Sequence, residues 1–81
     1  MGVLRVLSRH GDDRYQWDHT ALETGPAEAV AAVREAERIF AEQREHGATA
    51  VRVKPGQPAE RIEPFDPTAE QILMSPRVLG G

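Results

Sequence analysis

Residues 26–46, PAEAVAAVREAERIFAEQREH, are the stretch that decides the fold. Their apolar residues recur at spacings of three and four, which predicts an amphipathic helix with one face on a core. Pro26 suits the first turn, with Thr24 or Gly25 as the cap, and Gly47 is placed to end the helix. The apolar stripe comprises Ala29, Val30, Val33, Ala36, Ile39 and Phe40.

The segment before this helix has the period of strands. Residues 3–8 (VLRVLS) are apolar and β-prone, with Leu4 and Val6 on one face, and residues 14–18 (RYQWD) place Tyr15 and Trp17 together. Turn-forming residues lie between them, at 10–13 (HGDD), where Gly11 can adopt a positive φ. Residues 3–19 are therefore predicted to form a β-hairpin.

Three more short strands are predicted after the helix, at residues 49–54 (TAVRVK), 59–63 (AERIE) and 71–74 (QILM). Phe65 is expected in the core. Asp66 and Pro67 begin a turn before the last strand, with Asp66 as its cap. The fold class is thus α+β: a mixed sheet of four to five strands packed on one long helix.

Composition narrows the function classes. The chain has 81 residues, which fits one small domain, and it has no cysteine, which excludes disulfides, thiol nucleophiles and thiolate zinc sites. A net charge of −3 without a basic patch does not suit nucleic-acid binding. The longest apolar run, residues 29–33, is too short for a bilayer, and we expect a cytoplasmic protein. Lys54 is the only lysine among ten basic residues, and this arginine bias suggests a bacterial, GC-rich genome.

No residue cluster predicts catalysis or a metal site. His10, His19 and His46 lack metal-ligand spacing, and neither Ser8 nor Ser75 lies in a nucleophile elbow. Tyr15 and Trp17 could form a stacking platform, but without basic neighbours we interpret them as core residues. The protein is predicted not to be an enzyme and to hold no cofactor.

The chain ends ILMSPRVLGG over residues 72–81. This ending, together with the element order, resembles the β-grasp superfamily of ubiquitin and the bacterial sulfur carriers. Relatives in that superfamily, such as the molybdopterin-synthase small subunit and the thiazole-pathway carrier, end in a hydrophobic strand, a proline and a Gly-Gly. The longer helix and the altered acidic turn at residues 66–70 limit the resemblance to the superfamily. It implies a β-grasp domain over residues 1–75 and a flexible diglycine tail over residues 76–81.

The resemblance also implies a function for the tail. A partner adenylating enzyme would use ATP to activate the carboxylate of Gly81, which would then pass to an acceptor enzyme or a target protein. Glycines leave the tail narrow enough to enter such an active site. The implied conjugation residues are Gly80 and Gly81, and the implied contacts with the activating enzyme are Pro76, Arg77, Val78 and Leu79.

Several alternatives remain open from the sequence. The end use of the tail is either sulfur transfer or protein conjugation, and with Lys54 as the only lysine a conjugated modifier would favour single attachment. In another class, the chain is a non-conjugated interaction or adaptor subunit that binds through its sheet face or helix and has a frayed terminus. A small α+β domain of unrelated topology is the third possibility, which the strand order decides.

Overall fold

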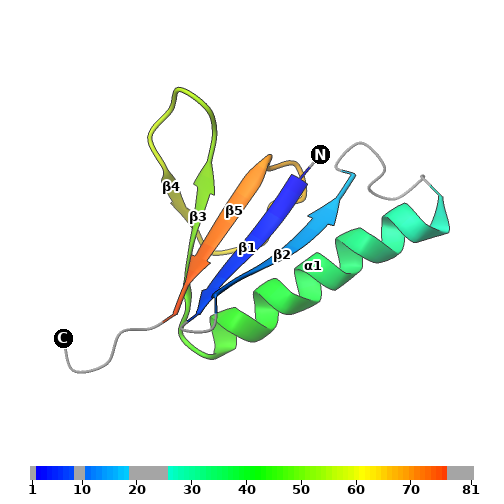
Figure 1. Ribbon diagram of the computed structural model, residues 1–81, viewed down its shortest axis with the longest axis horizontal. Coiled ribbons are helices and arrows are strands. Elements are labelled where there is room, and N and C mark those ends of the chain that lie inside the picture. Colours follow the sequence, from blue (N-terminus) through cyan, green and yellow to red (C-terminus); the bar gives the residue numbers. More distant parts are fainter. Residues whose placement is uncertain (1, 9–10, 19–25, 77–81) are drawn as a thin grey trace.

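The computed structural model describes residues 2–8, 11–18 and 26–76 of the protein. One helix, α1 (Ala27–Glu45), lies across one face of a five-stranded mixed sheet (Figure 1). The strands are β1 (Gly2–Ser8), β2 (Gly11–Trp17), β3 (Thr49–Val53), β4 (Glu60–Ile62) and β5 (Gln71–Ser75).

The strand order is β2-β1-β5-β3-β4. β1 and β5 are parallel, and every other neighbouring pair is antiparallel. The sheet therefore consists of two hairpin-like pairs, β1–β2 and β3–β4, joined by β5 at the centre. This α+β arrangement confirms the predicted class and is compatible with a β-grasp fold.

Helix α1 is one residue shorter at each end than predicted. Pro26 occupies the N-cap position with an extended ψ of 150°, so it precedes the first turn instead of belonging to it. At the other end Gly47, with φ of 88°, donates to the Arg44 carbonyl while Ala48 donates to Gln43, both at 3.0 Å. This pair of bonds is a Schellman motif, and it confirms Gly47 as the residue that ends the helix.

One strand boundary differs substantially from the prediction. Gly11, Asp12 and Asp13 were assigned to the turn, but β2 begins at Gly11, opposite Ser8. Asp12 is accommodated in the strand because the guanidinium of Arg5, across the hairpin, lies 2.6 Å from its carboxylate. β1, β3 and β5 each differ from the predicted range by one residue at one end, and β4 is one residue shorter at both ends.

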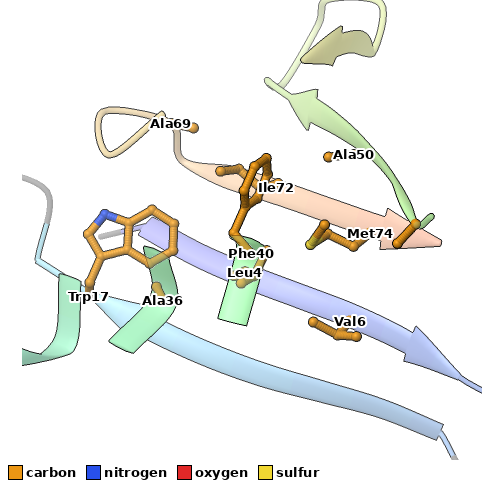
Figure 2. Close-up of a cluster of buried hydrophobic side chains, with 10 residues drawn as sticks. Leu4, Val6, Trp17, Ala36, Phe40, Ala50, Ala69, Ile72 and Met74 are labelled. Atoms are coloured by element: carbon orange, nitrogen blue, oxygen red, sulfur yellow. The ribbon is translucent and has the colours of Figure 1, made fainter. Parts of the chain in front are cut away.

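The core lies between α1 and the sheet. Leu4, Ile72 and Met74 on β1 and β5 are fully buried and form one core cluster with Phe40 of α1 (Figure 2). Trp17, at the end of β2, is 1% exposed, which makes it a core residue and not a stacking platform. The remaining buried side chains are Val6, Ala36, Ala48, Ala50 and Ala69, and none of the buried residues in the described ranges is polar or charged.

Candidate functional site

Strand β5 positions the predicted tail site. It alternates half-buried and fully buried residues, with Ile72 and Met74 at 0% exposure, and it pairs with β1 on one side and β3 on the other. Ser75 lies opposite Thr49 at the end of the pairing, and Pro76 follows it as an exposed residue. Because proline has no backbone N–H to donate, Pro76 does not extend the ladder.

A network of charged side chains holds the turn that leads into β5. Arg52 of β3 pairs through one nitrogen with Asp66 at 2.6 Å and through another with Glu60 of β4. The other carboxylate oxygen of Asp66 accepts bonds from the Thr68 backbone N–H at 2.9 Å and its hydroxyl at 2.6 Å. Asp66 therefore caps this turn, as the sequence predicted, and it also ties the turn to β3.

The electrostatics of Asp66 reflect two opposing causes. Partial burial raises the pKa of Asp66, but the hydrogen bonds from Thr68 and then Arg52 outweigh it, so the pKa lies below its ordinary value of 3.8. The carboxylate is thus charged in the native protein at neutral pH. An ionised group therefore holds the turn that leads into β5.

Only one of the six predicted tail-site residues, Pro76, lies among the described residues. Arg77, Val78, Leu79, Gly80 and Gly81 lie outside them. Their assigned roles in activation and conjugation therefore stay predictions. Lys54 is exposed directly after β3.

The sheet face opposite α1 is a second candidate surface, which we call the outer face. Paired residues of neighbouring strands share a face, so the register places the half-buried Val3, Leu7 and Leu73 there with Val51 and Val53. These apolar residues, which we call the apolar strip, are spread over the three central strands, β1, β5 and β3. Arg5, opposite Leu73, and Gln71, between Val3 and Val53, interrupt them. The alternation of each strand was evident in the sequence, but joining the apolar residues into one strip required the strand order.

Charged side chains lie within this strip, at Arg5 of β1, and beside it on β2. Arg5 and Arg14 lie directly opposite each other, and the Asp12 carboxylate accepts from both, at 2.6 and 3.3 Å. The pKa of Asp12 lies below its ordinary value, chiefly because of the hydrogen bond from Arg5. At the other edge, Arg61 of β4 is exposed and has no ion-pair partner among the described residues.

A third surface is a hollow of about 460 Å³ between the C-terminal half of α1 and residues 63–65, which we call the Phe65 hollow. The sequence did not indicate it, because its two walls are about twenty residues apart in the chain. Phe65 is part of its lining, and the ring contacts those of Trp17 and Phe40 at centroid distances of 5.2 and 5.6 Å.

Other kinds of site have no support within the described ranges. No group of three or more metal-binding side chains lies together there, although His10 and His19 fall outside these ranges. No helix in the described part of the chain is long and apolar enough to cross a membrane. Comparisons with protein-family models, with curated proteins and with solved structures found no match to this chain.

Proposed function

We propose that the protein is a small ubiquitin-like modifier or sulfur carrier that acts through the carboxylate of Gly81. An adenylating enzyme would activate this carboxylate with ATP, and an acceptor enzyme or target protein would receive the product. The protein itself supplies the recognition surface and the acyl group and needs no cofactor of its own. The proposal requires Gly81 to be the last residue of the mature chain.

The observation that carries the proposal is the position of β5. This strand is central and is anchored on both sides, whereas Pro76 after it is exposed. An acyl carrier needs a segment that enters a partner's active site while the domain stays folded. A segment that begins beyond a firmly held central strand meets this requirement, because β5 is held by its own pairing with β1 and β3. The compatible fold order and the absence of competing chemistry in the described ranges add support.

The chemistry follows from the carboxylate. It is a poor electrophile, and attack of its oxygen on the α-phosphorus of ATP gives an acyl-adenylate and releases pyrophosphate. A thiolate, a lysine amine or a sulfur donor at the oxidation level of hydrosulfide then attacks the carbonyl carbon, and AMP leaves. The product is a thioester, an amide or a thiocarboxylate respectively. Sulfur transfer and conjugation share the first step and differ only in this nucleophile.

The test uses the full chain, ATP and adenylating enzymes of the same organism, with intact-mass spectrometry as the readout. Pyrophosphate exchange measures the first step separately. We expect an adenylate, a thiocarboxylate or a covalent conjugate with the full chain and none with a chain that lacks Gly80 and Gly81. The proposal fails if the full and shortened chains behave identically while both are folded by circular dichroism.

The outer face favours a second candidate function, a non-conjugated interaction subunit. Its apolar strip on three central strands is suited to contact with another protein. In that case a Leu73→Ser substitution would abolish co-purification of the partner, whereas deletion of Gly80 and Gly81 would leave partner binding and phenotype intact. The reverse pattern would favour the carrier function.

A further inference from the structure

The Phe65 hollow combines an apolar base with an acidic rim. Phe65 and Ala41 provide apolar surface, from the segment before β5 and from α1 respectively. Glu37 and Glu45 lie four residues before and after Ala41, so they share its helix face, and Glu63 stands on the opposite wall. A bound segment would therefore meet carboxylates on both sides of an apolar centre.

The charges of this rim are not neutralised within the described part of the chain. On the neighbouring stripe of α1, Glu35 and Glu42 both pair with Arg38, at 2.7 and 3.1 Å. By contrast, none of the three rim glutamates has an ion-pair partner among the described residues. Among the described residues of this lining Arg44 is the one cation, and its guanidinium donates to the carbonyl of Ala48 at 2.9 Å, at the end of the helix.

We propose that the Phe65 hollow binds a basic segment of a partner protein in which an apolar side chain lies between two arginines or lysines. The apolar side chain would cover Phe65 and Ala41, and the two cations would pair with the carboxylates of the opposite walls. An arginine could also stack on the ring of Phe65. This inference goes beyond the tail chemistry, because none of the described residues that line the hollow belongs to the tail.

Charge complementarity selects this occupant over others. An anionic or nucleic-acid ligand would face three carboxylates at close range, and a wholly apolar segment would bury them without partners, which is costly. A segment with basic residues on either side of an apolar one satisfies both features of the surface. Salt should weaken the binding of such a segment, because the rim is open to solvent and its charges are screened.

The probe is the capped pentapeptide Gly-Arg-Leu-Arg-Gly, titrated into the full-length ¹⁵N-labelled protein at low salt. We expect saturable amide shifts confined to residues 37–45 and 63–65. The matched peptide with glutamates in place of both arginines should cause none, and replacing its leucine with glycine should weaken binding. Raising the salt to about 1 M, where the Debye length is about 3 Å, should also weaken it.

Substitutions on the protein sharpen the test. Glu37→Gln, Glu45→Gln and Glu63→Gln should each weaken the peptide about two- to five-fold, as expected for solvent-exposed ion pairs. Glu28→Gln is the matched control: this glutamate is exposed in the first turn of the same helix and has no ion-pair partner in the described part of the chain. Its binding should equal that of the unmodified protein, and the amide spectra report whether each variant is folded.

Three outcomes would overturn the proposal. Equal binding of the basic and acidic peptides would show that charge does not select the ligand. Unchanged binding by the Glu37→Gln/Glu63→Gln double variant would show that the peptide binds somewhere other than the Phe65 hollow. Binding seen only in an Arg77→Ala variant would mean that the chain's own residue 77 occupies the hollow. A chain lacking Gly80 and Gly81 should bind the peptide normally, so failure of the tail chemistry and failure of this site are distinguishable.

Discussion

The indole Nε1–H of Trp17 donates a hydrogen bond of 2.9 Å to the carbonyl oxygen of Pro67. This bond joins the end of β2 to the turn that precedes β5, fifty residues later in the chain. The indole is 1% exposed, its ring contacts Phe65, and Gly2 packs directly against it. One side chain therefore connects the first hairpin with the segment that delivers the last strand.

We expect Trp17→Phe to lower the free energy of unfolding by about 2–4 kcal/mol. The substitution removes aromatic volume from the core and leaves the Pro67 carbonyl without its partner, and each effect costs on the order of 1–3 kcal/mol. Urea unfolding monitored by circular dichroism measures the change. Gln16→Ala, an exposed neighbour on the same strand, is the control, and an equal loss in both variants would contradict the assigned role of Trp17.

We expect Gly2→Ala to destabilise the protein by about 1–3 kcal/mol, as overpacking does. A Cβ atom at residue 2 would lie 2.3 Å from the indole Cε2 of Trp17, which forces one of the two to shift. The cost should shrink in a Trp17→Leu background, because the obstructing ring is gone. A thermodynamic cycle over these variants measures the coupling, and strict additivity would argue against steric conflict.

Asp66→Asn should lower stability at pH 7 by no more than about 1 kcal/mol, because the ion pair with Arg52 is partly solvated. The pKa of Asp66 is depressed in the folded protein, so its charged form contributes stability above the unfolded value. This contribution is lost as the pH falls through the folded pKa, below 3.8. The difference in stability between the two proteins should therefore narrow as the pH falls below 3.8, and a difference that does not change with pH would contradict the linkage.

Leu79→Asp should reduce kcat/KM for adenylation by about tenfold or more, because a buried leucine contributes about 1.5–3 kcal/mol. The unfolding midpoint should stay unchanged, since residue 79 follows the last strand. Pyrophosphate exchange and urea unfolding give the two readouts. A loss of stability equal to the loss of activity would assign Leu79 to the fold instead of to the activating enzyme.

Lys54→Arg should leave single attachment to a target unchanged and remove any lysine-linked polymer of the protein. Lys54 is the only lysine and is exposed, so it is the one lysine amine that a second copy could acylate. Gel electrophoresis of conjugates formed with each protein measures this. Polymers that persist in the variant would indicate attachment at another group, such as the N-terminus.

The sequence predicts well those features that local chemistry controls. The periodicity of α1, its Gly47 end and the Asp66 cap are all confirmed, because each depends on residues within a few positions of one another. The start of β2 was wrong because the stabilising partner of Asp12 is Arg5, seven residues away across the hairpin. Local composition assigns two consecutive aspartates next to a glycine to a turn, and it contains no information on the ion pair with Arg5.

Surfaces built from distant segments could not be predicted in the same way. The apolar strip of the outer face depends on β5 lying between β1 and β3, and the Phe65 hollow depends on α1 meeting residues 63–65. The tail site is the reverse case: its motif is evident in the sequence, while the structure describes only Pro76 of it. Its chemistry remains a prediction that activation experiments decide.

The central position of β5 has a further consequence, for biosynthesis. β1–β2 and β3–β4 can each form early, but no hydrogen bond joins these two halves of the sheet until residues 71–75 are available. A nascent chain that stops before residue 71 therefore has two incomplete halves and an exposed apolar helix face. Native folding must wait until almost the whole domain has left the ribosome, so truncated products should be rapidly degraded instead of accumulating as partly active fragments.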